Sequence, residues 1–385
     1  MTYRIQWVDG LDALAQWADD WHALALAAPQ RLPMLSPAWI DAFARTRLPP
    51  QALFQCVLAE QNGRLLAVLP LVLCRNPPRL LGVAAAATPY DAHTAFGDVL
   101  VDPTGAPGLV AAVLQAACEH PRWRMRELAL RGVARTSPTL PALDALTQCS
   151  TSAVSFRNWG SFLAVAGGWG DYRDGLSKNF RANLRKARNR LRETGVSAPV
   201  FIWLTGHAAE PRHLQTFIQL EATGWKGQAG SAIAQDASVR RFYQALTDNA
   251  HRSGALEWHF MVVDGRTIAG HLALRCGRSL SLLKIAYDEQ FSHFSPGNLL
   301  FEQTAERAFT QGDTDEINCL TDMEWHRPWN MQRREYLDLR LFPKSWVGQS
   351  LGRAPRGLIM RAKRAAERWP ALARLYTQSQ GMNSS

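Results

Sequence analysis

The chain has 385 residues, of which 47% are hydrophobic and 20% charged, and this composition excludes a disordered or fibrous protein. At about 100–200 residues per domain, the length predicts two domains or at most three. Apolar runs such as 65–73 are far shorter than the roughly 20 residues that span a bilayer. The first residues contain no apolar secretion signal, and the 6 cysteines have neither disulfide nor metal-ligand spacing. These features predict a cytoplasmic protein with reduced thiols and no metal site.

The positive charge is concentrated in two segments. The formal net charge is +10, and residues 178–193 and 346–385 each carry seven cations against one acid. The remaining chain is therefore nearly neutral, which excludes a uniformly basic nucleic-acid-binding protein. The pattern predicts two local surfaces that attract anions, and nucleic acid is not an expected partner.

A weak internal repeat predicts the fold. Strands at 54–59 and 65–73 flank an Asn-Gly turn, and strands at 257–263 and 267–274 flank an Asp-Gly turn. Each pair is followed by an apolar stretch that ends in Tyr-Asp, then by a helix (108–118 or 296–309) and a strand (125–130 or 315–320). Five elements in the same order favour two copies of one α/β unit over chance similarity, although such tight turns are common.

Glycines at 167, 168 and 170 interrupt this pattern. They predict a boundary that divides the chain into a unit at 1–165, a second unit at 166–345 and a basic amphipathic helical tail at 346–385. Helices are expected at 177–194, 211–222 and 237–252. The tail has an apolar face over 358–376 and a kink at Pro370.

The segment 280–309 carries the clearest candidate binding site. An apolar strand over 280–287 precedes Ser295-Pro296-Gly297, where Ser295 is a good helix N-cap and Pro296 a good first helical residue. A helix N-terminus at the end of a strand favours phosphate, because free N–H groups and the helix dipole both attract anions. The alternative interpretation is an ordinary capped helix.

The basic helix at 178–193 also has two interpretations. Its cations have almost no compensating acids at helical spacing, which indicates that Arg181 and Arg185 bind phosphates or an anionic substrate. The alternative is a solvated helix face.

Two further groups are candidates. In Glu221-Ala-Thr-Gly-Trp225-Lys226, Glu221 is a candidate base and Lys226 an anion ligand, whereas Trp225 either contacts substrate or only anchors the loop. Asp322, Glu324 and His326 follow a predicted strand, where binding sites of α/β proteins often form.

The order of these motifs resembles one known family. The basic helix is followed by Glu221-x-x-x-Trp225-Lys226, Tyr287-Asp288, Ser295-Pro296-Gly297 and Glu324-Trp325-His326. This order is similar to that of the GNAT-superfamily acyltransferases of the cellulose-biosynthesis-associated (CelD-like) branch, which are related to Fem-type peptidoglycan aminoacyl transferases. The similarity is best over 165–345 and weaker over 30–165. Relatives usually have Lys where His326 stands, and their glycine-rich pyrophosphate loop is reduced here to Gly297.

The resemblance implies two GNAT-like mixed-sheet units in tandem and an acetyl-CoA or other acyl-CoA donor. It places the donor near Ser295, Gly297, Asn298 and Leu299, while Arg181, Arg185 and Lys226 hold phosphates or an anionic acceptor. The transfer chemistry needs a base, for which Glu221 and Asp288 are the first candidates and His271 a weaker one. Tyr287 is a candidate proton donor to the leaving thiolate.

Three function classes remain open. The first is an acyl-CoA-dependent N- or O-acyltransferase acting on a sugar, amino or lipid-linked acceptor. The second is a Fem-type transferase that uses aminoacyl-tRNA, although no sustained heptad run predicts the coiled coil common in such enzymes. The third is a non-catalytic GNAT-like module that binds anions or membrane. Residues 353–376 are expected to contact an anionic membrane peripherally or a partner, or to pack on the body of the protein.

Overall fold

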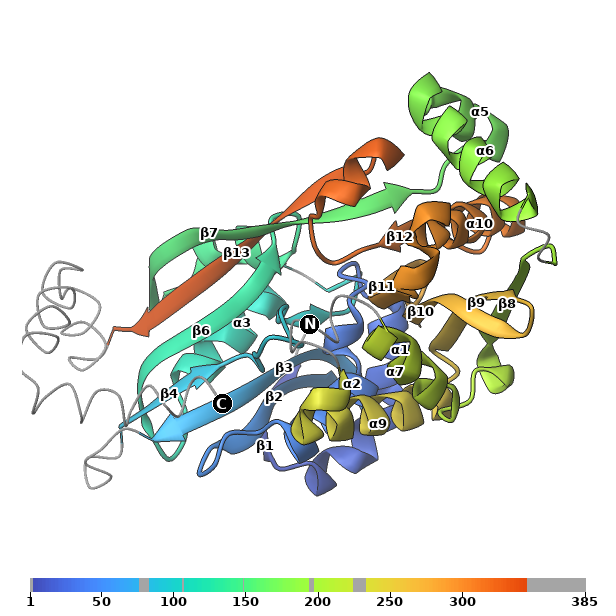
Figure 1. Ribbon diagram of the computed structural model, residues 1–385. Helices are drawn as coiled ribbons and strands as arrows, with labels where there is room; N and C mark the ends of the chain where they lie inside the picture. The colour runs from blue at the N-terminus through green and yellow to red at the C-terminus, as the bar shows by residue number, and fades with distance from the viewer. Residues whose placement is uncertain are drawn as a thin grey trace, which may run out of the picture.

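A computed structural model describes residues 3–75, 83–105, 107–147, 149–193, 197–223 and 233–344. The strands of this part form one mixed sheet in the order β1-β2-β3-β4-β6-β13-β7-β12-β11-β10-β9-β8, with β5 beside β3 (Figure 1). The predicted mixed-sheet α/β class is therefore confirmed. The predicted tail at 346–385 lies outside the described residues, and the unit boundaries at 165 and 345 stay predictions.

The bounds of the elements follow in chain order. The strands are β1 Arg4–Asp9, β2 Leu53–Gln61, β3 Arg64–Arg75, β4 Val83–Ala87, β5 Leu100–Val101, β6 Arg124–Ala134, β7 Cys149–Ala164, β8 Val200–Thr205, β9 Leu256–Val263, β10 Arg266–Cys276, β11 Ser279–Tyr287, β12 Glu316–Asn318 and β13 Gln332–Pro343. The α-helices are α1 Ala18–Ala27, α2 Pro37–Thr46, α3 Pro107–Cys118, α4 Thr139–Ala142, α5 Trp169–Gly175, α6 Lys178–Glu193, α7 His213–Thr223, α9 Ala237–Arg252 and α10 Pro296–Gln311.

Both predicted hairpins form, and their turn residues explain why. Asn62 and Gly63 have φ values of 53° and 79°, and Asp264 and Gly265 have 48° and 75°. Two consecutive positive φ angles match the right-handed twist of the flanking strands, and Asn, Asp and Gly tolerate them best. The predicted order of three strands, a helix and a strand appears twice, as β2-β3-β4-α3-β6 and β9-β10-β11-α10-β12.

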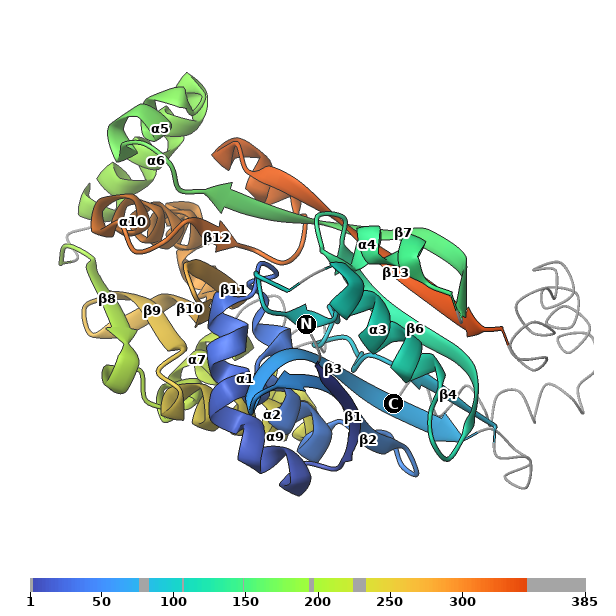
Figure 2. The same ribbon diagram turned by 180° about the vertical axis from the view of Figure 1, so that it is seen from behind.

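The two halves exchange a strand at the centre of the sheet. β7 follows β6 in sequence, but β13 lies between them and pairs with both. In return, β7 pairs with β12 of the second half, through Phe162–Ala164. β7 and β13 lie side by side in both views of the ribbon (Figures 1 and 2). The long β7 and β13 were not expected from the sequence.

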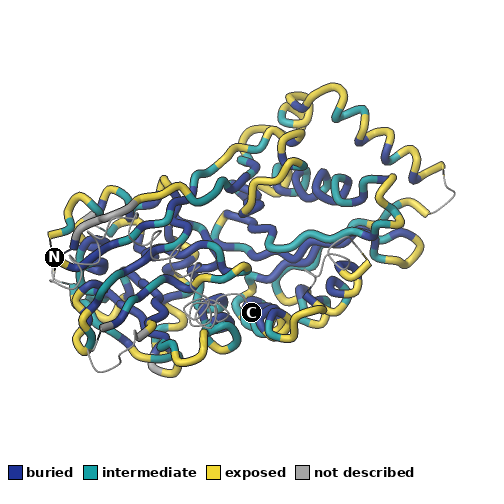
Figure 3. The backbone as a smooth tube through the Cα atoms, turned by 60° about the vertical axis from the view of Figure 1, so that its left-hand side comes forward, coloured by how far each residue is buried: buried dark blue, intermediate teal, exposed yellow. Residues whose placement is uncertain are grey.

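Helices cover both faces of this sheet. One face carries a continuous core under α1, α2, α7 and α9, which includes Trp39, Phe217 and Trp258. The opposite face has two separate cores, one beneath α3 and one beneath α6 and α10. The middle of the sheet is buried, whereas α5 and α6 project from one end with an exposed outer surface (Figure 3). The layers explain why strand residues alternate between two cores, as Cys56 and Val57 do.

Candidate functional site

β11 and β12 separate halfway along β11. Their parallel ladder pairs only Ser279–Ser281 with Glu316–Asn318. β11 continues beside β10 to Tyr287, whereas the chain after β12 follows β7, where the Cys319 N–H donates to Ser161 O and the Ser161 N–H donates to Thr321 O. The separation opens the sheet directly before the helix that follows β11.

The corresponding strands of the first half stay together. β4 pairs in parallel with β6 over Val83–Ala87, and the pairing is extended by the Thr88 N–H, which donates to Ala129 O. Gly97 N donates to Arg131 O, and the Thr88 hydroxyl accepts from the Arg131 N–H. These bonds close the equivalent place in the first half, so within the described residues this separation of strands is a feature of the second half.

A β-bulge lies in β11 at the opening. The register with β10 shifts between Leu272 opposite Lys284 and Ala273 opposite Leu282, which leaves Leu283 as the extra residue. Lys284 then lies on the face of α7, where its Nζ is 3.8 Å from Glu221 Oε1. Tyr287 lies on the opposite face, in the core beneath α10. Beyond the bulge, β11 therefore carries an ammonium group on the face of α7 and a phenol on the face of α10.

The N-terminus of α10 lies next to this opening. Ser295 has a left-handed φ of 50° and makes no side-chain cap bond, so the predicted hydroxyl cap is wrong, although Pro296 begins the helix as predicted. A Cβ added to Gly297 would meet only Tyr287 Cδ1, at an ordinary 3.6 Å. The Asn298 amide oxygen accepts a hydrogen bond from Trp329 Nε1 at 3.3 Å. Leu299 is less available to a ligand than the preceding residues, because its side chain is buried in the core and its N–H already donates to Ser295 O.

The basic helix α6 crosses this helix start. Arg188 forms an ion pair of 2.6 Å with Glu302 of α10, and Arg190 donates to the carbonyl oxygen of His293. Arg181 pairs with Asp174 at 3.0 Å, whereas Arg185 is exposed. Acids outside the helix thus offset part of its charge, which the local sequence did not show. The exposed cations of α6 are Lys178, Arg185, Lys186, Arg190 and Arg192.

Two predicted acid–base residues are held by structural bonds. Asp288 is 1% exposed, accepts from the Gln290 N–H as the cap of a 3-10 helix at Glu289–Phe294, and pairs with Arg266. His271 is buried against His259, with ring nitrogens 3.4 Å apart, and burial followed by His259 lowers its pKa well below 6.5. The Tyr287 phenol is half-buried, and burial and Glu289 raise its pKa. Asp288 and His271 therefore have structural roles, and their assignment as bases stays a prediction.

Glu221 lies in a polar cluster instead. Its Oε2 accepts from the Ile233 N–H at 2.7 Å, and burial lowers the Lys284 pKa although Glu221 opposes this effect. The Lys284 ammonium lies 5.5 Å from the ring centre of Tyr243 on α9. The Tyr243 hydroxyl is 3.3 Å from His93 Nδ1, and His93 belongs to the loop after β4. The cluster therefore includes residues of both halves.

The predicted acceptor residues are not gathered in one place. Asp322 accepts from the Ser161 hydroxyl at 2.7 Å and pairs with Arg333, and these bonds lower its pKa. The Glu324 side chain is 91% exposed. His326 is buried, its Nδ1 accepts from the Met323 N–H, and burial lowers its pKa to about 4. Trp225 and Lys226 lie outside the described residues.

His93, Tyr243 and Lys284 were missed by the sequence analysis. The available signal was Lys284, a lone cation within the apolar strand 280–287. His93 and Tyr243 lie 150 residues apart, and no local pattern links them. Within the described ranges no group of three metal-ligating side chains occurs.

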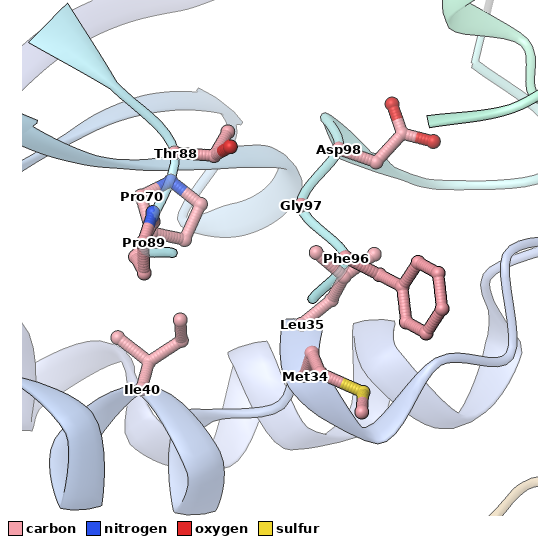
Figure 4. A pocket seen from close by; sticks show the side chains of 9 residues that line it. All are labelled: Met34, Leu35, Ile40, Pro70, Thr88, Pro89, Phe96, Gly97 and Asp98. Atoms are coloured by element: carbon pink, nitrogen blue, oxygen red, sulfur yellow. The ribbon is translucent and has the colours of Figure 1, made fainter. Parts of the chain in front are cut away.

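One small hollow lies in the first half. It measures about 180 Å³ and is bordered by Met34, Ile40 and Phe96 among other residues, but it is too narrow for a water molecule (Figure 4). Asp98 lies at its edge with its carboxyl group turned away from the apolar side chains. A second hollow, of about 340 Å³, lies beside Gln30 and Arg334 and is wide enough to admit water. Neither coincides with the opening at β11.

Residues 178–327 match the family model described as acetyltransferase (GNAT) domain. No curated protein matches the chain significantly. The solved structure of FemX has a TM-score of 0.61 with 12% identity, over 84% of this chain and 95% of FemX. A conserved protein of unknown function from Bacteroides thetaiotaomicron VPI-5482 has a TM-score of 0.54 with 16% identity, over 88% of this chain and all of the other.

A third similar structure is the C-terminal domain of a putative lysylphosphatidylglycerol synthetase from Agrobacterium fabrum. It has a TM-score of 0.51 with 12% identity, over 85% of this chain and 92% of that domain. These likenesses establish a shared fold along most of the chain. Residues 178–327 thus carry a GNAT acetyltransferase domain, and this domain is part of a larger fold of the kind found in FemX. Its place in the cellulose-biosynthesis-associated branch stays a prediction.

Proposed function

We propose that the protein transfers an acetyl or longer acyl group from acyl-CoA to an amine or hydroxyl of a sugar, amino or lipid-linked acceptor. One observation carries the proposal: β11 and β12 separate after three residue pairs, and the N-terminus of α10 lies against the end of β11, where Gly297 faces Tyr287. An extended thioester arm with amide groups suits the space between two separating strands, because strand backbones bind amides in extended chains. The closed β4–β6 pair of the first half offers no such space.

The donor phosphates would lie at the first turn of α10. Free N–H groups and the helix dipole favour an anion there, and Gly297 lets the ligand approach the backbone. The nearby cations of α6, such as Arg185 and Arg190, add electrostatic attraction. Arg181 contributes less, because it is paired with Asp174.

In this proposal the thioester arm passes between the separating strands, from one face of the sheet to the other. Phosphates on the face of α10 would leave the thioester directed toward the face of α7 and α9, where Glu221 and Lys284 lie. There the acceptor nucleophile attacks the thioester carbonyl, a base removes its proton and the CoA thiolate departs. Glu221 stays a candidate base, and Tyr287 a candidate proton donor to the thiolate.

Isothermal titration calorimetry with acetyl-CoA tests the donor site. Gly297→Glu places a carboxylate where phosphate should bind, and we expect at least a tenfold loss of affinity, about 1.4 kcal/mol. Gly170→Glu is the matched control, because this exposed glycine on α5 has open space around it. Equal affinity of both folded variants and the parent would show that the donor binds elsewhere.

A second test uses the charge of α6. Arg185→Glu should weaken acetyl-CoA binding, and binding to the parent should weaken as salt rises. Arg212→Glu, at an exposed residue just before α7, should leave binding unchanged. Binding that depends on neither salt nor Arg185 would return α6 to the role of a solvated face.

Two alternatives remain from the resemblance. Aminoacyl-tRNA as donor is favoured by the exposed cations of α6, and tRNA therefore belongs in the same titration. Binding of tRNA without binding of acetyl-CoA would support the Fem-type alternative. Binding of neither would support a non-catalytic module.

Membrane association through residues 353–376, and with it a peripheral cytoplasmic location, also stays a proposal. No helix in the described part of the chain is long and apolar enough to cross a bilayer. Co-sedimentation with anionic and neutral liposomes, comparing the full chain with one that ends at Ser350, tests this proposal. Equal pelleting of both proteins would contradict it.

A further inference from the structure

The loop between β4 and β5 connects the first half to the opening in the second. Phe96 packs on Tyr336 of β13 with ring centres 4.2 Å apart, and Tyr90 lies under Arg157 of β7 at 4.5 Å. His93 contacts Tyr243 of α9. The loop thus crosses the face of β13 and β7, and its middle lies beside α9, on the face where we place the thioester.

Hydrogen bonds fix the conformation of this loop. Asp91 Oδ1 accepts from the His93 and Thr94 N–H groups at 2.8 and 2.6 Å, and Asp91 Oδ2 pairs with Arg47 at 2.7 Å. Arg47 also donates to the Ser238 hydroxyl at 2.8 Å, which ties the loop to the start of α9. The loop therefore holds His93 in a defined position.

We propose that His93 is the general base that takes the proton from the acceptor nucleophile, a role that rests on the proposed acyl transfer. In this role the His93 Nδ1–H donates to the Tyr243 oxygen, 3.3 Å away, which leaves Nε2 as the nitrogen that accepts the proton. A base is oriented by a third group in the same way in other acyl-transfer sites. Its Nε2 has no hydrogen-bond partner among the described residues, and the side chain is only half-buried, so an acceptor can reach it. Glu221, by contrast, is 1% exposed.

Burial and two nearby cations favour the neutral form of His93. Burial lowers its pKa, Lys284 on β11 and Arg47 on α2 lower it further, and Asp91 and Asp236 oppose them. Tyr243 contacts both His93 and Lys284, so His93 lies near the part of β11 that has separated from β12. A neutral imidazole at neutral pH can accept a proton, which a base in this position must do.

The step balances as follows. The acceptor nitrogen or oxygen forms a bond to the thioester carbonyl carbon while its proton passes to His93. The carbon–sulfur bond then breaks, the electron pair leaves with the CoA sulfur, and the proton passes from His93 to the thiolate or to water. The products are the acylated acceptor and free CoA, and His93 is neutral again.

Two nucleophiles that need no specific acceptor site test this assignment. Water must lose a proton to attack acetyl-CoA, whereas hydroxylamine is a strong neutral nucleophile that needs little base assistance. Release of CoA thiol is measured with each. We expect His93→Ala to slow hydrolysis by about 10²-fold or more, to change the reaction with hydroxylamine less than threefold, and to be partly rescued by added imidazole. His207→Ala, at an exposed histidine, is the control.

Further readouts separate a base from a structural residue. Acetyl-CoA affinity should be unchanged in His93→Ala, and hydrolysis by the parent should decline with falling pH only below about 6.5, with that limb absent from the variant. His93→Gln keeps a side chain of similar length and replaces the alanine variant if that variant fails to fold.

Equal losses with both nucleophiles, or no loss, would overturn the assignment while leaving acyl transfer in place. If Glu221→Gln slows hydrolysis but not the reaction with hydroxylamine, and His93→Ala slows neither reaction, the base is Glu221. A parent that neither binds acetyl-CoA nor accelerates either reaction would contradict the proposed function itself.

Discussion

Replacing Asp98 by asparagine should change how the stability of the protein depends on pH. Asp98 is 1% exposed and accepts hydrogen bonds from the Ser137 and Thr139 hydroxyls at 2.5 and 2.6 Å and from the Val99 N–H at 2.8 Å. Burial outweighs these bonds and raises its pKa from 3.8 to about 6. The native protein therefore binds this proton more tightly than the unfolded chain does.

The magnitude follows from linkage. A pKa that is raised by about two units corresponds to about 3 kcal/mol at about 1.4 kcal/mol per unit. Because the native pKa is the higher one, this stabilisation is complete below pH 3.8 and is lost as the pH rises through 6. Asparagine does not titrate, so the stability of Asp98→Asn relative to the parent should increase by about 3 kcal/mol between pH 4 and pH 7.

Urea denaturation at several pH values between 4 and 8 measures this difference. Any cost of the amide within the hydrogen-bond network is independent of pH, so only the slope tests the reasoning. Asp102→Asn is the control of opposite sign: burial opposes ionisation of Asp102, but Thr104 and Arg64 outweigh it and lower its pKa. Loss of the Asp102 carboxylate in Asp102→Asn should therefore lower the free energy of unfolding above pH 4. A pH-independent difference between Asp98→Asn and the parent would refute the argument.

Three further predictions concern stability. Gly132→Ala should lower the free energy of unfolding by about 3 kcal/mol, because φ is +68° and the new Cβ would collide with Ala95 O. Gly10→Ala, at φ +72° with open space around it, should lower it by about 1 kcal/mol in the same denaturation assay. Arg188→Ala should cost about 2 kcal/mol, because it leaves the buried Glu302 carboxylate without its cation, whereas Arg185→Ala should change stability by less than about 0.5 kcal/mol. Residues 1–165 and residues 166–345 should not unfold cooperatively when each is expressed alone, but they should do so when the two are co-expressed. Thermal unfolding followed by circular dichroism measures this difference.

Local signals in the sequence were sufficient for the repeated elements. The Asn-Gly and Asp-Gly turns specify their hairpins through backbone conformation, and Pro296 marks the start of α10. The strand exchange was not predictable in this way. β7 carries exposed Val154 and Phe156 and many polar residues, and no pattern within it shows that β13 and β12 are its partners. Pairing between distant segments depends on the whole sheet.

The candidate site was predictable to a similar extent. The helix start at Gly297 and the nearby basic helix followed from local composition, and the structure brings them together through Arg190 and His293. The acid–base assignments depended on burial, which a single sequence does not reveal. Asp288 forms a cap and an ion pair, whereas Lys284 reaches Glu221 only because a bulge at Leu283 changes the direction of the strand.

The exchanged strands also explain why the two halves should act as one catalyst. The chain on the far side of the opening, from Cys319 to Thr321, is held by backbone bonds to Ser161 of β7, a strand from the first half. Without β7, nothing in the described part of the second half would replace those bonds, and the buried N–H and C=O groups would each cost about 1–3 kcal/mol. The first half would likewise lose β13, which fills the place beside β6 and buries Leu339 and Leu341. Each half therefore lacks a central strand on its own. Under the proposed reaction, the first half supplies the loop that carries His93 and the strand that holds one side of the opening, although its own β4–β6 pair is closed.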